Sequence, residues 1–529
     1  MKKTLLLLGV IFMAFSTTAQ SVITVSGDIT TSTTWTSNNV YKLSGFVYVT
    51  NNAELTIQPG TVIIGEKSSK GSLIITRGAK IIADGTAAQP IVFTSGEPVG
   101  QRTYGDWGGL IILGRSAVND PAGEKLIEGG VDPVKGLYGG TVPNDNSGVL
   151  RYVRIEFPGI AFQPNNEING LTLGGVGSGT TIDYVQVSYS GDDSYECFGG
   201  TVNMKHLIAY RGLDDDFDTD FGYSGCMQFL VSVRDSSIAD ISGSNAFESD
   251  NDASGTTNTP FTNAKISNAT IVGPITGSGN TYNSNYKRGA HIRRSSKTCI
   301  YNSAIAGFPT GLLLDGANCE ANANSGDLQF RNSVFAGCNT PLAIASGSAF
   351  DISTWFNTAS FGNSILSAAT DLQLTNPYNY NQPDLLPQPA TSLLNGADFN
   401  NSNLSNPFFD VVSYRGAFGS NDWTGGWSNY NCANTYYVGM DEIVREGSIS
   451  IFPQPASSIA SIRFDARTSG RVSISLLDLQ GRNLSIIADK QFESGFQTVN
   501  FSTVELSAGL YLLRMESEKG QAAFRFIKN

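Results

Sequence analysis

A short apolar strand followed by a small turn recurs along most of the chain, and this repeat constrains the fold more than any other feature. The turns at positions 159, 191, 212, 235, 273, 307 and 337 are separated by 32, 21, 23, 38, 34 and 30 residues. The shortest spacings match one coil of a parallel β-helix, and the longer ones match a coil with an inserted loop. Because one coil cannot bury its apolar face alone, stacked coils must share a core. The uneven spacing disfavours a propeller, whose blades repeat at a fixed length.

Within each copy, apolar and polar residues alternate, which places Val, Ile and Leu inward and polar side chains outward. Three copies carry an asparagine at the same place, namely Asn268, Asn302 and Asn332. We expect these amides to occupy similar positions and to bond one another as a ladder. The sequence therefore predicts a right-handed parallel β-helix, capped by residues 21–51 at one end and by the region around 423–427 at the other.

The chain divides into four predicted segments. Residues 1–20 read as a signal peptide, with Lys2 and Lys3 before an apolar stretch that is too short to span a bilayer. Residues 21–440 form the predicted β-helix, and 441–448 form a linker. Residues 449–529 are expected to fold as an antiparallel Ig-like β-sandwich of about seven strands. After removal of the signal peptide, no transmembrane segment is predicted.

Composition narrows the classes of function. A formal net charge of -12 disfavours a nucleic-acid partner, because a phosphate backbone needs a basic surface. The chain has six cysteines but only two histidines, and it lacks a CxxC pair, so a zinc site or a histidine triad is disfavoured. An exported chain can form disulfides, and neighbouring coils favour the pairs Cys197–Cys226 and Cys319–Cys338.

Three motifs near the C-terminus resemble the type A sorting domain of the type IX secretion system. They are FPQPA at 452–456, LDLQGR at 477–482 and LSAGLYL at 506–512, followed by Lys528. Gln454 stands where the family usually has Asn. The resemblance implies transport across the outer membrane of a Gram-negative bacterium by the type IX machinery, removal of the domain by a sorting peptidase, and a location at the cell surface or outside the cell.

The rest of the chain resembles a widespread family of uncharacterised bacterial surface β-helix proteins with pectin-lyase-like architecture. The resemblance rests on LTIQPGTVI at 55–63, GDWGG at 105–109, CFGGTV at 197–202 and YRGAFG at 414–419. It implies the fold and a surface location, and it implies no particular activity.

Acidic residues concentrate in one segment of the predicted β-helix. Residues 183–252 hold 14 Asp and Glu but only three Lys and Arg, and an aromatic-acid step recurs at 195–196, 217–218 and 247–248. Stacking would bring these carboxylates together, and like charges that close need a cation or a proton. Ca²⁺ is the predicted partner. The candidate ligands are Asp193, Glu196, Asp215, Asp216 and Asp218. The other interpretation is a solvated acidic face, or pairing with Arg211 and Arg234.

A basic cluster follows, comprising Lys287, Arg288, His291, Arg293, Arg294 and Lys297. Beside the acidic loops, it would meet some requirements of a polysaccharide lyase or a glycoside hydrolase acting on an acidic polysaccharide. The candidate catalytic residues of that alternative are Asp215, Asp216, His291 and Arg293. The other interpretation is charge balance between coils. Because no catalytic set is complete, the sequence favours a non-catalytic surface protein that binds a glycan, matrix or another cell.

Overall fold

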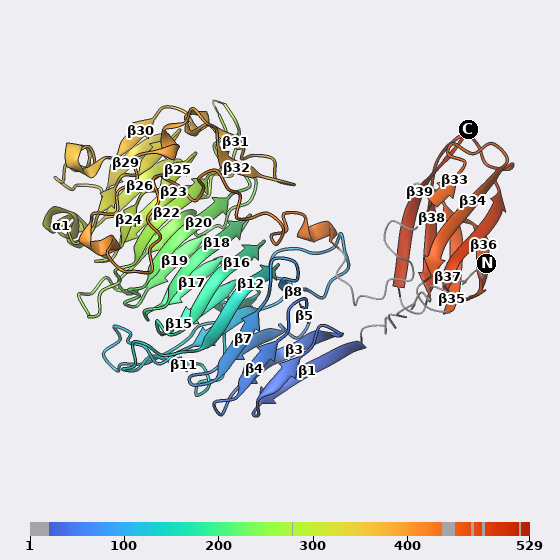
Figure 1. The fold of residues 1–529 in the computed structure, drawn as a ribbon, viewed down its shortest axis with the longest axis horizontal. Coiled ribbons are helices and arrows are strands. Elements are labelled where there is room, and N and C mark those ends of the chain that lie inside the picture. Colours follow the sequence, from blue (N-terminus) through green and yellow to red (C-terminus); the bar gives the residue numbers. More distant parts are fainter. Residues whose placement is uncertain are drawn as a thin grey trace, which may run out of the picture. The chain divides into compact units, whose positions relative to one another are not determined.

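A computed structural model describes residues 21–163, 166–277, 279–435, 450–466, 470–478, 482–517 and 520–529. The chain divides into two compact units, one spanning Val22–Thr435 and the other containing Tyr436–Asn529 (Figure 1). The predicted signal peptide and the predicted linker at 441–448 lie outside the described residues.

The first unit is a right-handed parallel β-helix whose coils build three parallel ladders. Ladder I contains β2 (Thr33–Trp35), β4 (Glu54–Ile57), β7 (Lys80–Asp84), the first halves of β12 (Gly148–Glu156), β16 (Thr181–Ser188), β18 (Asn203–Tyr210), β20 (Cys226–Val233) and β22 (Lys265–Val272), then β24 (Cys299–Tyr301) and β27 (Phe330–Arg331).

Ladder II contains the first half of β3 (Asn39–Val49), β5 (Val62–Gly65), β8 (Ile91–Ser95), the second halves of β12, β16, β18, β20 and β22, then β25 (Ala304–Ala306), β28 (Val334–Ala336) and β30 (Ser364–Leu366).

Ladder III carries the candidate site. It contains the second half of β3, β6 (Ser72–Ile75), β9 (Gly109–Leu113), β15 (Leu171–Gly174), β17 (Tyr195–Phe198), β19 (Phe217–Asp220), β21 (Ser244–Ser249), β23 (Tyr286–Arg293), β26 (Thr310–Asp315) and β29 (Thr340–Ile344). Strand β1 (Ser21–Ile29) pairs with β3 at the N-terminal end. Small hairpins project from the coils: β10 (Lys125–Leu126) with β11 (Leu137–Tyr138), and β13 (Ala161–Gln163) with β14 (Asn166–Glu167).

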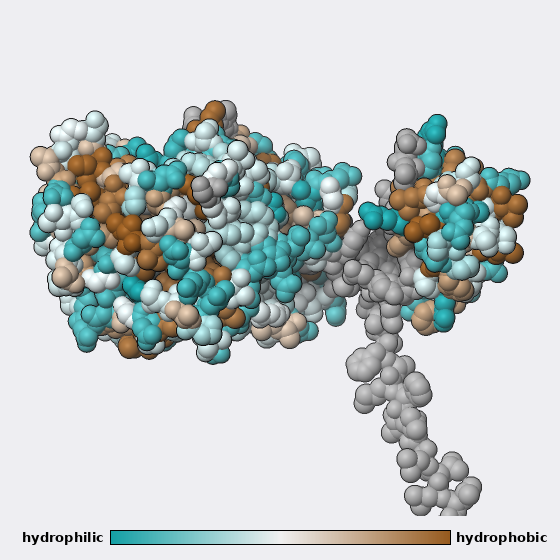
Figure 2. All heavy atoms as spheres, turned by 90° about the horizontal axis from the view of Figure 1, so that it is seen from above, coloured by the Kyte–Doolittle hydropathy of each residue, from teal (hydrophilic) through white to brown (hydrophobic). Residues whose placement is uncertain are grey.

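The core follows from alternation along each strand. Val185, Leu207 and Leu230 are aligned in consecutive coils, and all three are fully buried. Burying a side chain of this kind contributes roughly 1.5–3 kcal/mol. Seen from above, hydrophilic residues cover much of the β-helix unit, and hydrophobic residues gather in patches among them (Figure 2). The predicted inward placement of Val, Ile and Leu is therefore confirmed.

The bend between ladders I and II is made by residues with positive φ. Asn268, Asn302 and Asn332 have φ of 59°, 51° and 54°, and strand register places them at equivalent positions, as predicted. Asparagine adopts this left-handed conformation more readily than most residues. The expectation that these amides bond one another was wrong for the described residues. Asn302 Nδ2 instead donates to Ser267 Oγ, which donates to Asn268 Oδ1.

Beyond β30, the chain runs back along the outside of the coils. A hairpin of β31 (Leu374–Asn376) and β32 (Asp384–Pro387) precedes residues 396–435, which we call the strap. Trp427 of the strap packs edge-on against Tyr152 and Tyr184 on the side of the β-helix. The prediction that residues 423–427 cap the far end was therefore wrong. At that end of the β-helix, helix α2 (Ile352–Phe356) places Trp355 and Phe356 in the core instead. A second helix, α1 (Ala317–Ser325), follows β26.

The second unit contains two antiparallel sheets in the residues described. One is β33 (Ser450–Phe452), β34 (Ile459–Ala466) and β37 (Gly495–Ser502), and the other is β36 (Asn483–Phe492), β35 (Gly470–Leu477), β38 (Gly509–Ser517) and β39 (Gly520–Lys528). Val472, Ile474 and Leu476 alternate toward their own buried core, which matches the predicted small β-sandwich.

All six cysteines lie among the described residues, and none of them forms a disulfide. Cys197 faces the core from β17 in ladder III, whereas Cys226 begins β20 in ladder I and packs near Cys299. Cys319 is buried from α1, and Cys338 follows β28. The expected pairs Cys197–Cys226 and Cys319–Cys338 are therefore corrected, because their members lie on different elements and most are buried as apolar side chains.

Candidate functional site

A column of polar side chains follows the outside of ladder III. Strand register aligns Thr172 with Glu196, Glu196 with Asp218, Asp218 with Glu248, and Glu248 with His291. Neighbouring strands lie about 4.8 Å apart, so the column places one polar group per coil. The aromatic residue before each acid points the other way, and these rings stack inside the core: Tyr195, Phe217 and Phe247. The aromatic-acid step in the sequence thus produces an acidic row, as expected.

Carboxylates from the turns before these strands join the row. Three sets have ligand atoms within 4.8 Å of one another. The sets are Asp193, Glu196 and Asp218; Asp215, Asp218 and Glu248; and Asp192, Asp193 and Asp214. Backbone bonds fix the turns, because the Asp215 N–H donates to Asp193 Oδ1 over 2.8 Å and the Asn245 N–H donates to Asp215 Oδ1. The geometry thus concentrates negative charge along one edge of ladder III.

Burial makes this charge costly. Burial raises the pKa of Asp193, Glu196 and Asp218 well above the ordinary range. Neighbouring carboxylates raise these pKa values further: Asp215 acts on Asp193, Glu128 on Glu196, and Glu248 on Asp218. Burial also raises the pKa of Asp214 to about 6. The row therefore favours states in which a proton or a cation neutralises some of its carboxylates.

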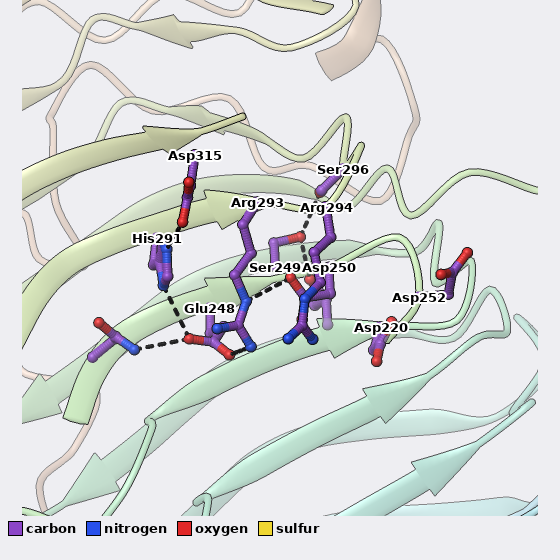
Figure 3. A network of polar contacts seen from close by, with 12 residues as sticks. Asp220, Glu248, Ser249, Asp250, Asp252, His291, Arg293, Arg294, Ser296 and Asp315 are labelled. Atoms are coloured by element: carbon purple, nitrogen blue, oxygen red, sulfur yellow. Dashed lines mark hydrogen bonds and ion pairs between the residues drawn. The ribbon is translucent and has the colours of Figure 1, made fainter. Parts of the chain in front are cut away.

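At its other end, the row meets compensating basic groups (Figure 3). Arg293 forms ion pairs with Glu248 and Asp250, and Arg294 reaches Asp250 over 2.8 Å. His291 lies between Glu248 and Asp315, with Nδ1 3.2 Å and Nε2 3.1 Å from their oxygens. Burial raises the pKa of Glu248, but His291 and Arg293 outweigh this effect and the net pKa is lowered. Much of the basic cluster thus balances charge between neighbouring coils.

Two basic residues of the cluster differ from the others. Within the described residues, neither Lys287 nor Arg288 forms an ion pair, although Lys287 Nζ donates to the Ser284 carbonyl. Both line a shallow hollow of about 420 Å³ that also includes Tyr282 and Thr310. Arg288 is aligned with Asn245, which donates to both Asp215 and Glu248, so the hollow adjoins the acidic row.

The structure brings together only some of the residues proposed from sequence. Asp193, Glu196, Asp215 and Asp218 belong to the row, but Asp216 forms a fully buried ion pair with Arg234 over 2.7 Å. Asp216, proposed both as a calcium ligand and as a residue of the alternative catalytic set, therefore lies outside the carboxylate sets formed by the other candidate ligands. The other interpretation of the acidic segment expected its acids to pair with Arg211 and Arg234. Arg234 does pair with Asp216, and Arg211 pairs with Asp235.

Other members of the site were missing from the predicted set. Asn169 donates to both Glu196 and Glu128, and Thr172 begins the outward column. The third aromatic-acid step could have identified Glu248. No repeat marks Glu128, because it lies in the long insertion after β9 and reaches the row only through the fold.

Comparison with known proteins agrees with this architecture. Residues 27–373 match the pectate-lyase-like β-helix domain, well over half of the chain. The chain belongs to this family. Residues 450–529 match the secretion-system C-terminal sorting domain. No curated protein matches the chain.

Both resemblances drawn from the sequence motifs are thus confirmed. This member of the pectate-lyase-like β-helix family is exported through the type IX secretion system, whose machinery its sorting domain engages, to the cell surface or the extracellular space. In the part of the chain that the structure describes, none of the helices is long and apolar enough to cross a membrane.

Proposed function

We propose that this exported protein binds an extracellular polysaccharide along the outside of ladder III without cleaving it. The observation that carries the proposal is the hollow at Lys287 and Arg288, where two cationic side chains lack an ion-pair partner among the described residues. A carboxylate or sulfate group of a sugar would form ion pairs with these two side chains, since a guanidinium binds such groups in a bidentate manner.

The surroundings suit a sugar chain. The Tyr282 ring is half-buried beside the hollow and offers an apolar surface to a sugar ring. The Thr310 hydroxyl at the same hollow can bond sugar hydroxyls. The row repeats one polar group per coil, which fits a linear ligand with its own repeat. Binding at this surface also accords with an adhesive role outside the cell.

Two features support binding over cleavage by a lyase or glycoside hydrolase. Arg293 is held by Glu248 and Asp250, so it is poorly placed to abstract a proton from a ligand. Glu248, the row carboxylate next to the hollow, accepts from Asn245 and pairs with Arg293, so it is occupied within the protein and poorly placed to act as a catalytic acid or base.

The test is a binding screen of acidic and neutral polysaccharides with the purified protein. The double variant K287Q/R288Q should weaken binding to an acidic polysaccharide about tenfold or more, since hydrogen bonds to charged groups contribute about 1.5–3 kcal/mol. Lys80→Gln, a half-exposed lysine on β7, is the matched control and should bind normally. Equal binding by the double variant would refute the assignment. New reducing ends or unsaturated products would favour the enzymatic alternative.

A further inference from the structure

One set of carboxylates in the acidic row lacks compensating charge. Oxygens of Asp193, Glu196 and Asp218 lie within 4.8 Å of one another, and they come from two successive coils. Among the described residues, no lysine, arginine or histidine lies within ion-pair distance of these three groups. Glu248 and Asp250, further along ladder III, are instead neutralised by Arg293 and Arg294. This set is therefore balanced either by protonation of its carboxylates or by a bound cation.

Buried oxygens without a hydrogen-bond donor surround the same set. Thr172 is 1% exposed and stacks on Glu196 in the outward column, yet its Oγ1 has no hydrogen-bond partner. Asn169, also 1% exposed, contacts Glu196 through Nδ2 while its Oδ1 is unpartnered. Asp218 Oδ1 is a third such oxygen. A buried acceptor without a partner is unfavourable, so three such oxygens beside one set of carboxylates indicate that an electropositive ligand belongs there.

We propose that Asp193, Glu196 and Asp218 bind a Ca²⁺ ion, with Thr172 and Asn169 able to supply neutral oxygens. Calcium takes six to eight oxygen ligands in flexible geometry, and carboxylate, amide and hydroxyl oxygens are the groups present. The set contains no sulfur or imidazole, which disfavours zinc and copper. This inference does not depend on the polysaccharide proposal, because the ion would be held by the protein alone.

Neighbouring acids are less suited to the ion. Asp215 shares the next set with Asp218 and Glu248, but its oxygens already accept from the backbone and side chain of Asn245. Glu248 in that set is paired with Arg293. The raised pKa values of Asp193, Glu196 and Asp218 support the same choice, because a bound cation would relieve the repulsion that causes part of the shift.

The experiment measures calcium binding to the full chain by calorimetry, and melting temperature with Ca²⁺, with Mg²⁺ and with chelator. Calcium should bind to the wild type and raise its melting temperature, because a ligand that binds only the folded state stabilises it. Asp218→Asn and Glu196→Gln should weaken calcium binding at least tenfold and abolish the calcium-dependent rise. Glu54→Gln, an exposed acid on β4, is the control and should keep the full response.

Folding of the variants is checked in the same experiment. In chelator, Asp218→Asn and Glu196→Gln should be at least as stable as the wild type, because each removes a charge from a crowded row. No heat of binding and no calcium-dependent change in the wild type would overturn the proposal. So would a calcium response that survives in both variants, or a response to Mg²⁺ alone.

Discussion

At the scale of single residues, side-chain amides on the coils fasten the strap to the β-helix. Gln186 Nε2 donates to the Asn429 carbonyl over 2.9 Å, and the Asn429 N–H donates back to Gln186 Oε1 over 2.8 Å. Gln228 forms the same two bonds with Asp410, and Asn302 forms them with Asp398. Each side-chain amide therefore bonds both the backbone N–H and the backbone carbonyl of one strap residue, as a neighbouring β-strand would.

Removing one of these amides should loosen the strap. We expect Gln228→Ala to lower the free energy of unfolding of the β-helix unit by about 1–3 kcal/mol, because both Asp410 backbone groups lose their partner. Urea denaturation measures the effect. Gln58→Ala, an exposed glutamine, is the control and should change stability by less than about 0.5 kcal/mol. Equal effects of the two variants would show that the amide pairing contributes nothing.

Residue-scale prediction from the sequence succeeded where alternation decides direction. Phe217 must enter the core, so Asp218 must face outward, and the acidic row followed from that rule. Alternation does not apply in the turns before strands. Asp215 and Asp216 are neighbours there, yet one joins the row and the other turns to Arg234, which lies in the following coil. Such partners are set by the tertiary packing of loops, which the repeat does not encode.

At the scale of elements, the strands of the coils could be predicted from the sequence, but the position of the strap on the outside of the coils could not. Strand copies recur with the same apolar pattern, which fixes register because a slip by one residue would expose the core. The strap has no such pattern, and residues 423–427 are assigned to the far end from the sequence only because an open end of a β-helix needs a cap. Trp427 instead packs against the stacked rings of Tyr152 and Tyr184, which come together only when the coils have formed.

Contacts between successive coils should make stability depend on pH. Glu66, in the turn after β5, accepts from Lys42, Ser44 and Ser69, and these bonds lower its pKa to about 2. A folded-state pKa below the unfolded value contributes stability above pH of about 4.3, and this contribution declines as pH falls toward 2. The stability difference between the wild type and Glu66→Gln should therefore be larger at pH 5 than at pH 3.

Melting temperatures at the two pH values provide the measurement. Glu54→Gln, an exposed acid on the neighbouring strand β4, is the comparison and should show little change in its difference from the wild type. High salt should reduce the Glu66 effect, since the carboxylate is partly exposed and its interactions are screened. A Glu66→Gln difference that is the same at both pH values would mean that the hydrogen bonds do not hold the charge.

At the scale of the whole molecule, the two units have separate hydrophobic cores, one in the coils and the other in the sorting domain. Deleting residues 450–529 should therefore leave the β-helix folded, with an unchanged melting transition for that unit. Export should nevertheless fail at the outer membrane, because the sorting domain is the part that engages the type IX machinery. We expect the truncated chain in the periplasm, as measured by cell fractionation and by protection from added protease.

Fusing residues 436–529 to a folded periplasmic reporter supplies the converse control, since the fusion should reach the surface or the medium. A truncated chain that still becomes accessible to external protease on intact cells would show that the β-helix carries its own route out, and the sorting domain would then be dispensable.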